Sequence, residues 1–301
     1  MNRRDLLQMS AALGVGASLT GKVLAAGEEG GSAASAEAVQ PLRPPADGAI
    51  PVAFLISDGA VPIDFVGPWE VFAGVTVKGH SPFQLYTVAE TLAPIHGEGG
   101  LNIVPNYTFD TAPAPKVIVI PAQSSRTDGI LAWVRKAAQT ADLTMSVCTG
   151  AFLLAKTGLL DGKQATTHHD AYKQFAMANP AVRLKRGARY VDLGNIASAG
   201  GLSSGIDLAL HVVQRYYGKD VATATAYYLE YQGQGWLDSN SNSVYARQSV
   251  STEEHPLCPV CSMEVDKASA PRFAYQGKTY YFCMQEHEAL FEANPGPYLE
   301  T

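Results

Sequence analysis

Residues 143–155 read Leu143-Thr-Met-Ser-Val-Cys148-Thr149-Gly150-Ala-Phe-Leu-Leu-Ala155. A short apolar run ends at Cys148, small residues form a turn, and the segment after Gly150 has helical spacing. The pattern predicts a strand, a sharp turn and a helix, with Cys148 at the corner. At such a corner the sulfur lies at the carboxyl end of a sheet, beside free helix N–H groups that favour a thiolate. Cys148 is therefore a candidate nucleophile with a lowered pKa; the alternative is a buried, unreactive small hydrophobe.

The segments around this corner alternate between apolar strand runs and helices. Because the strands are almost entirely apolar, they predict an α/β fold with a mainly parallel sheet that helices cover on both faces. Strands are predicted at 52–57, 83–89, 117–121 and 143–147, with shorter candidates at 165–168 and 190–193 and part of a hairpin at 101–109. Helices are predicted at 69–73, with Pro68 at the start, and at 130–138, 206–216 and 221–231.

Composition limits the classes of function. The chain has 301 residues and a formal net charge of -6. Its sequence lacks the clustered basic residues of a nucleic-acid-binding surface. Its 4 cysteines are Cys148 alone and Cys258, Cys261 and Cys283 near the end. Three clustered cysteines cannot all pair with one another, so the chain has no disulfide framework.

The amino-terminal residues predict an export signal. Arg3 and Arg4 are followed by Leu6-Leu7, an uncharged run at 9–21 and small residues up to Ala26. This order is that of a signal peptide over 1–26, and the adjacent arginines resemble a twin-arginine signal, which implies a periplasmic protein. The glycine-rich apolar run is too short for a membrane span, although an uncleaved apolar anchor is the alternative. Residues 27–49 are expected to be a flexible linker.

The carboxyl-terminal residues 257–301 predict a metal-binding module that follows a linker at 232–256. Cys258 and Cys261 are spaced to bind one ion, and Cys283 and His287 would share one face of a helix starting at Cys283. Three sulfurs and one imidazole suit Zn(II) or Cu(I), and a metal would explain how so short a segment folds. The alternative is a disulfide between Cys258 and Cys261, because the periplasm is oxidising.

Five ordered motifs lie within residues 50–231. They are Val52–Ser57, Pro62–Phe72, Ser146–Ala151, Gly158–Gly162 with Ala165–His168, and Ser203–Ala209. Together they resemble the DJ-1/PfpI superfamily, whose members are class I glutamine amidotransferase-like proteins. The resemblance is to the branch of isonitrile hydratases and amidase-like domains of transcription regulators. It implies a flavodoxin-like three-layer sandwich, a homodimer, and a small-molecule substrate bound at a nucleophile elbow.

The same resemblance implies roles for individual residues. Cys148 would attack the substrate carbon, Asp64 would shuttle the proton, and Thr149 would donate a hydrogen bond. Asp64 could instead cap a helix, and Thr149 could merely be tolerated at the turn. Ala122-Gln123 stands where many relatives have two glycines, which alters an oxyanion pocket.

Other polar residues have structural interpretations. Thr149 stands where protease-like relatives have a histidine, which argues against a Cys-His hydrolase. His168 and His169 are expected to follow a strand beside the elbow strand and to have a structural role. Asp207 is expected to pin the last long helix rather than to take part in chemistry.

The carboxyl-terminal segment resembles a YHS domain, a small metal-binding module, around Tyr280–Cys283. Relatives often have aspartate in place of Cys258 and cysteine in place of His287, and both residues present here are competent ligands. The sequence thus predicts an exported, lyase-like or hydrolase-like enzyme acting on a small carbon–nitrogen substrate, with an appended metal module. The alternative is a periplasmic copper or zinc handling protein whose large domain is a non-catalytic or redox-responsive scaffold. Transcription regulation is disfavoured by the acidic, exported chain.

Overall fold

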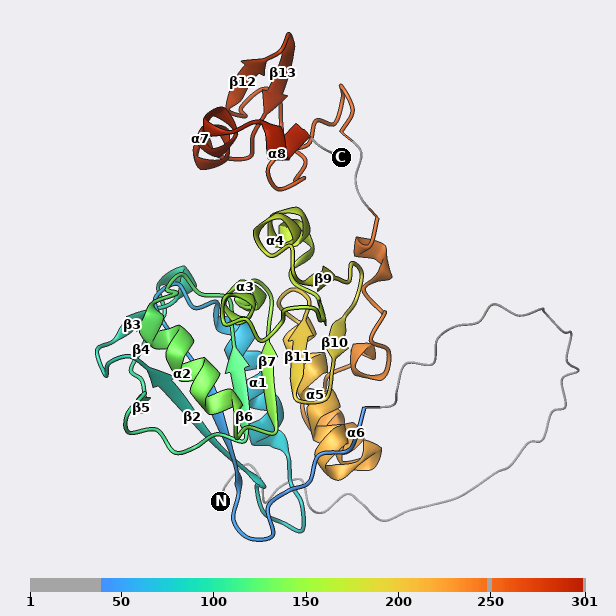
Figure 1. Ribbon diagram of the computed structural model, residues 1–301. Coiled ribbons are helices and arrows are strands. Elements are labelled where there is room, and N and C mark those ends of the chain that lie inside the picture. Colours follow the sequence, from blue (N-terminus) through green and yellow to red (C-terminus); the bar gives the residue numbers. More distant parts are fainter. Residues whose placement is uncertain (1–38, 248–250, 300–301) are drawn as a thin grey trace, which may run out of the picture. The chain divides into compact units, whose positions relative to one another are not determined.

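The computed structural model describes residues 39–247 and 251–299, so the predicted signal peptide lies outside the described residues. Residues 39–247 contain a 7-stranded sheet with the order β10-β11-β7-β6-β1-β2-β5 (Figure 1). Neighbouring strands run parallel except β10 and β11, which are antiparallel. The strands are Ile50–Leu55 (β1), Phe83–Ala89 (β2), Tyr107–Thr108 (β5), Val117–Ile120 (β6), Leu143–Ser146 (β7), Tyr190–Asp192 (β10) and Ile196–Ala199 (β11). Within the described part of the chain, no helix has the length and apolar character needed to cross a bilayer.

Helices cover both faces of the sheet, which confirms the predicted α/β three-layer sandwich (Figure 1). Val52 and Phe54 point into one core with side chains of α1, α5 and α6. Ala53 and Leu55 point into the other core with side chains of α2, α3 and α4. Because both faces of β1 are buried, its residues are apolar without alternation. The helices are Pro62–Gly74 (α1), Asp128–Ala138 (α2), Gly150–Lys156 (α3), Tyr172–Ala178 (α4), Ser204–Tyr217 (α5) and Lys219–Tyr228 (α6).

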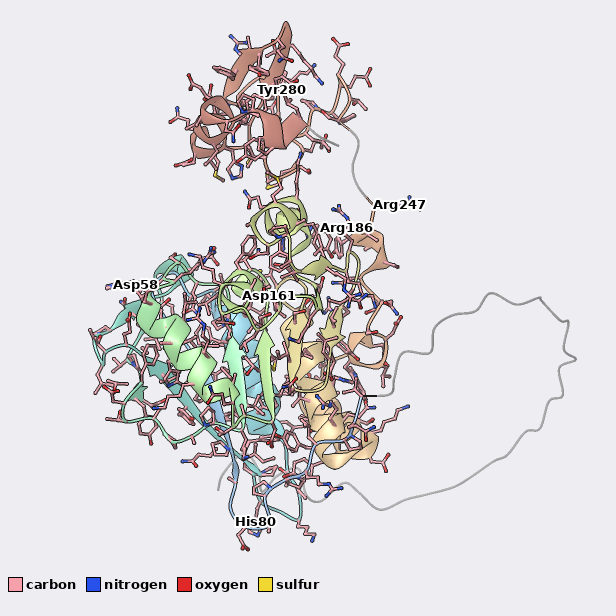
Figure 2. All side chains as sticks on the ribbon, viewed as in Figure 1. Asp58, His80, Asp161, Arg186, Arg247 and Tyr280 are labelled. Atoms are coloured by element: carbon pink, nitrogen blue, oxygen red, sulfur yellow. The ribbon has the colours of Figure 1, made fainter. Side chains whose placement is uncertain are left out.

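The parallel strands end at one edge of the sheet, and this edge carries the predicted corner. Asp58 follows β1 at this end of the domain, whereas His80 precedes β2 at the opposite end (Figure 2). The loops after β1, β6 and β7 therefore meet beside Cys148. Ligands of open α/β sheets bind at this carboxyl edge.

Four details differ from the sequence-based prediction. Helix α1 begins at Pro62, so Pro68 lies inside it rather than at its start. The Pro68 ring packs beside Gly205, where an added Cβ would lie 3.3 Å from it. The predicted hairpin is divided: β3 (Ile95–His96) pairs with β4 (Asn102–Ile103), whereas β5 joins the main sheet parallel to β2. The strand at 165–168 is reduced to β8 (Gln164–Ala165), which pairs with β9 (Arg183–Leu184) outside the main sheet. Strand β11 was not predicted, because two of its four residues are alanines with a low strand propensity.

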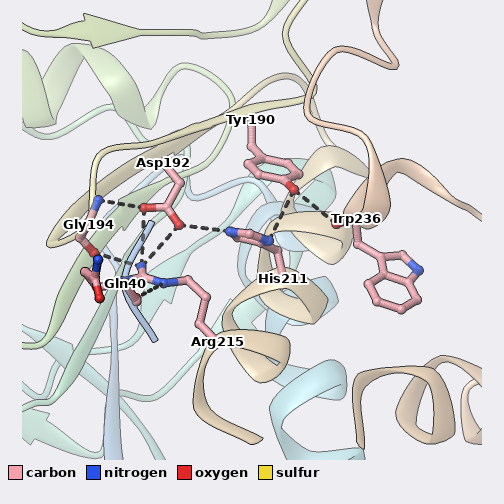
Figure 3. Close-up of polar contacts among 7 residues, drawn as sticks. All are labelled: Gln40, Tyr190, Asp192, Gly194, His211, Arg215 and Trp236. Carbon is pink, nitrogen blue, oxygen red and sulfur yellow. Dashed lines mark hydrogen bonds and ion pairs between the residues drawn. The ribbon is translucent and has the colours of Figure 1, made fainter. Parts of the chain in front are cut away.

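A buried polar network fixes β10 to α5 (Figure 3). The Asp192 carboxylate accepts hydrogen bonds from His211 Nε2 at 2.9 Å and from the Arg215 guanidinium at 3.1 Å. The Tyr190 hydroxyl lies 3.2 Å from His211 Nδ1 and donates to the Trp236 carbonyl at 3.0 Å. Because every partner is buried or nearly so, these bonds hold the antiparallel edge of the sheet to its helix.

Both segments expected to be linkers contact this domain where they are described. The Gln40 carbonyl accepts a hydrogen bond from Arg215 at 3.0 Å, and the Leu42 N–H donates to the Arg215 carbonyl at 2.9 Å. The segment after α6 forms two short 3-10 turns, Gly235–Leu237 (η3) and Ser243–Tyr245 (η4), and η3 buries the Trp236 side chain. The buried Trp236 side chain holds this segment against the domain, although the glycine-rich and serine-rich composition around it is typical of a linker.

Residues 251–299 form a small unit with its own aromatic core. Strands β12 (Arg272–Tyr275) and β13 (Lys278–Tyr281) make a hairpin, with Gln276 and Gly277 in the left-handed region at the turn. Phe291 in α7 (Gln285–Ala293) is fully buried, and its ring centroid lies 4.9 Å from that of Tyr280, which Figure 2 labels, with the two rings tilted by 38°. Helix α7 begins at Gln285 rather than at Cys283, and α8 is Gly296–Leu299.

Candidate active site and metal centre

Cys148 lies at the corner between β7 and α3, in a strained backbone conformation. Its φ of 57° is in the left-handed region, which residues with a Cβ atom seldom adopt. Gly150 makes the close approach possible, because a Cβ at this position would lie 2.2 Å from the Ile120 carbonyl oxygen. The arrangement is that of a nucleophile elbow, in which a tight turn lifts the side chain to the edge of the sheet.

Three segments fix the backbone and sulfur of Cys148. Its N–H donates to the Gly200 carbonyl at 2.8 Å, and its carbonyl accepts from the Thr167 hydroxyl at 2.9 Å. The backbone N–H groups of Thr149 and Leu202 hydrogen-bond to the sulfur and favour the thiolate. Gly200 and Leu202 follow β11, so the unpredicted strand supplies half of this support.

Asp64 lies in the first turn of α1 and is fully buried. Its Oδ2 accepts a hydrogen bond from the Ala122 N–H at 3.0 Å, and the Cys148 thiol is the polar side chain that interacts with its carboxyl group. Oδ1 has no hydrogen-bond partner among the described residues. Burial raises the pKa of Asp64 from 3.8 to about 7, although the bonds from Ala122 and Cys148 oppose this shift and the Glu98 charge adds to it.

The thiol has a raised pKa, so the prediction of a lowered pKa for free Cys148 is wrong. Burial, followed by the charge of Asp64, raises the pKa of Cys148 to about 12, and the N–H groups of Thr149 and Leu202 only partly offset this. The Cys148 residue is 6% exposed. Helix α3 is short, and desolvation of the sulfur outweighs its dipole.

The pair can nevertheless perform proton-coupled addition. Because the Asp64 pKa is near neutrality, its carboxylate can take the thiol proton as sulfur attacks, and the resulting acid can return the proton. The nucleophile is then formed on demand rather than stored as a thiolate. This chemistry requires the carboxyl group and the thiol to face each other away from water.

The other predicted residues lie around this pair with different roles. Thr149 is half-buried at the N-cap of α3 and makes no side-chain cap. The Ala122 N–H is occupied by Asp64, as described above, so it is not a free oxyanion donor. Gln123 is buried, donates to the Leu55 carbonyl at 3.3 Å and leaves its Oε1 without a partner among the described residues.

The expected position of His168 and His169 is wrong. They follow β8, which pairs with β9, whereas the elbow strand β7 lies between β6 and β11. Asp207 accepts hydrogen bonds from the Tyr231 hydroxyl at 3.0 Å and the Trp236 N–H at 2.9 Å, and it forms an ion pair with Arg189. Asp207 therefore fixes the segment after α6 to α5, which agrees with the structural role predicted for it.

In residues 251–299 the structure brings the four predicted ligands together. Their ligand atoms, in Cys258, Cys261, Cys283 and His287, all lie within 4.8 Å of one another. The Cys261 and Cys283 sulfurs are 3.5 Å apart, and His287 Nδ1 is 3.1 Å from the Cys283 sulfur and 3.6 Å from the Cys258 sulfur. A tetrahedral zinc ion with bonds of about 2.3 Å to sulfur needs ligand separations of about 3.8 Å, so the cluster fits a metal ion.

The local backbone prepares this cluster for a cation. The Cys261 thiol and the N–H groups of Cys283, Cys261 and Val260 hydrogen-bond to the Cys258 sulfur and lower the pKa of Cys258, although burial opposes this shift. The Cys258 N–H donates to the Met263 carbonyl at 2.8 Å, which closes the Cys-x-x-Cys turn. All cysteines are free in the structure, so the alternative disulfide between Cys258 and Cys261 is not formed.

Comparisons with known proteins agree with this geometry. Residues 51–215 match the DJ-1/PfpI family. The chain is 33% identical to the isonitrile hydratase of Pseudomonas putida over 198 residues, which are 64% of this chain and 83% of that protein. It is 26% identical to the HTH-type transcriptional regulator GbdR of Pseudomonas aeruginosa, of which it covers 41% in a match that spans 49% of this chain.

Solved structures give the same result. A ThiJ/PfpI family protein from Pseudomonas syringae has a TM-score of 0.54 and 28% identity, and the match covers 62% of this chain and 77% of that one. DJ-1 of Schizosaccharomyces pombe, at 17% identity and a TM-score of 0.51, shares the fold, with coverage of 60% and 98%. The family match ends at residue 215, before the cysteine cluster begins.

Proposed function

The chain belongs to the DJ-1/PfpI family, and from that premise we propose that it hydrates or hydrolyses a small carbon–nitrogen substrate, in the manner of an isonitrile hydratase. The observation that carries the proposal is the buried Asp64 carboxyl group beside the Cys148 thiol at a left-handed corner. The likeness to isonitrile hydratase covers most of that enzyme's length. A small substrate also fits a thiol that is almost fully enclosed.

The proposed reaction converts an isonitrile and water into an N-substituted formamide. The Cys148 sulfur bonds to the terminal carbon while its proton passes through Asp64 to that carbon, which gives a thioimidate. Water then adds to the same carbon, and one of its protons moves to nitrogen. The carbon–sulfur bond breaks as the second proton returns to sulfur through Asp64. No atom is oxidised or reduced over the cycle, and Thr149 and Leu202 hold the departing sulfur through their N–H groups.

The experiment is a screen of aliphatic isonitriles and small amides, with product detected by mass spectrometry. Wild-type protein should release the formamide, whereas Cys148→Ser and Asp64→Asn should lose activity by about a hundredfold or more. Cys283→Ser is the matched control, because it removes a thiol outside the elbow. Turnover that survives Cys148→Ser would refute the mechanism.

We propose that the cysteine cluster of the YHS-like segment binds one Zn(II) or Cu(I) ion. Four soft or borderline ligands at tetrahedral separations support this assignment. Cys258, Cys261, Cys283 and His287 would hold the ion, which would stabilise the small aromatic core. Elemental analysis should find the metal in wild type and in Cys148→Ser, and should lose it in Cys261→Ser with Cys283→Ser. Full metal content after both changes would end this assignment.

A second function is supported by the enclosed, high-pKa thiol. If the screen finds no substrate and Cys148 forms no covalent adduct, the family domain is a scaffold, and the protein handles metal through its cluster alone.

For the location, we propose export to the periplasm by the twin-arginine route. For the oligomeric state, we propose a homodimer. Replacing Arg3 and Arg4 with lysine should retain the protein in the cytoplasm on cell fractionation. A periplasmic double variant would refute the route.

A further inference from the structure

A second group of ligand-type side chains lies in the described part of the main domain, directly after β8. His168, His169 and Asp170 bring one donor atom each to within 4.8 Å of one another. Asp170 Oδ1 is 3.2 Å from His169 Nε2, and Asp170 Oδ2 is 3.7 Å from His168 Nδ1. None of these residues takes part in the proposed chemistry of Cys148 and Asp64.

The chemistry and spacing of the side chains in the cluster suit a cation. The two imidazole rings are adjacent, with centroids 4.4 Å apart. The Asp170 N–H donates to His168 Nδ1 at 3.3 Å, which caps the short 3-10 turn His169–Ala171 (η2), and an ion bound at Nδ1 would replace this long hydrogen bond. Neutral imidazole nitrogens and one carboxylate are ligands of borderline divalent metals.

The rings are also held in place. His168 packs on the loop after β11, where a Cβ on Gly201 would lie 2.1 Å from the ring. His169 lies on the ring of Tyr245 in η4, with centroids 4.3 Å apart. The Asp170 side chain is 44% exposed, so an ion can enter from solvent. Ligands about 2.1 Å from an ion lie about 3.0 to 3.4 Å apart, and the observed separations need only small side-chain rotations.

We propose that His168, His169 and Asp170 form a second metal site, built without cysteine, that takes a borderline divalent cation such as Zn(II). With three protein ligands, the ion keeps at least one open position for water or another ligand. The site differs from the cysteine cluster in lacking thiolate. Cu(I) is therefore disfavoured here, and the ion exchanges more readily with solvent.

The test measures zinc stoichiometry on the full chain, demetallated and then equilibrated with excess zinc before gel filtration. Wild type should hold about two ions per chain, and His169→Ala and Asp170→Asn should each hold about one. His96→Ala is the matched control, because His96 is also exposed beside an aspartate, Asp58, at 3.7 Å. This control should retain about two ions.

Cobalt distinguishes the two sites by their ligands. Co(II) bound by cysteines has a thiolate charge-transfer band, whereas Co(II) bound by histidine and aspartate has only ligand-field bands. In Cys261→Ser with Cys283→Ser, the charge-transfer band should vanish and a ligand-field spectrum should remain, to be removed by His169→Ala. One zinc per wild-type chain, or a stoichiometry unchanged by both His169→Ala and Asp170→Asn, would overturn the proposal and leave the cluster as an ion pair.

Discussion

Replacing Asp64 with asparagine should stabilise the domain while abolishing its activity. Asp64 is fully buried, and desolvation is the main reason why its pKa rises from 3.8 to about 7. Asparagine has the same shape and can still accept the hydrogen bond from the Ala122 N–H, but it carries no charge to desolvate. The substitution therefore removes an electrostatic cost that the proposed chemistry imposes on the fold.

The magnitude and its pH dependence follow from proton linkage. Below about pH 4 the carboxyl group is protonated in the folded and the unfolded chain, so it does not affect relative stability. Between about pH 4 and pH 7 only the unfolded chain ionises, and stability falls as pH rises. Above about pH 7 the full cost of about 4 kcal/mol is present, since each pH unit between the two pKa values contributes about 1.4 kcal/mol. Asp64→Asn should therefore gain about 3 to 4 kcal/mol at pH 8 and little at pH 4.

The assay is urea unfolding at pH 4.5 and pH 8, followed by tryptophan fluorescence. All 3 tryptophans, Trp69, Trp133 and Trp236, belong to the domain that contains Asp64, so the signal reports this domain. Asp128→Asn is the matched control: Asp128 is also in the first turn of a helix but is exposed, and its effect should stay below about 1 kcal/mol. An Asp64→Asn stability change that is independent of pH, or a loss of stability at pH 8, would refute the reasoning.

Three further perturbations test the site and its support. Burial and the charge and hydrogen bond of Asp64 raise the Cys148 pKa, so iodoacetamide should label Cys148 of the folded wild type at neutral pH more slowly than an unfolded control. Labelling of Cys148 in Asp64→Asn should be about tenfold faster than in wild type, as measured by peptide mass spectrometry. Fast labelling of wild type would contradict the raised pKa. Gly150→Ala should lower the free energy of unfolding by about 3 kcal/mol, since its Cβ would collide with the Ile120 carbonyl, and an unchanged denaturation midpoint would show that the corner can relax. Asp207→Asn should cost about 3 kcal/mol, because it removes a buried carboxylate and leaves the half-buried Arg189 without its charged partner, and a loss below about 1 kcal/mol would reduce the ion pair to a surface contact.

Much of the fold is readable in the sequence because it depends on local patterns. The apolar runs that became β1, β2, β6 and β7 are buried on both faces, and such burial leaves a continuous signal. Strand β11 was not predicted, because its small residues have little intrinsic strand preference. Its extended conformation depends on pairing with β7 and β10. Pro68 was placed at a helix start, since a local rule cannot show that Pro62 already occupies that position.

The candidate sites, like the fold, combine features set by local sequence spacing with features set by tertiary packing. By itself, the sequence determined the cysteine corner and the Cys258, Cys261, Cys283 and His287 ligand set, because short spacings fix which side chains can meet. Only the tertiary structure decided that Asp64 would be sealed beside Cys148, that desolvation would raise both pKa values, and that two histidines would adjoin Asp170. The physical reason is that spacing along the chain is a local property, whereas the loss of water around a charge depends on every segment that packs against it.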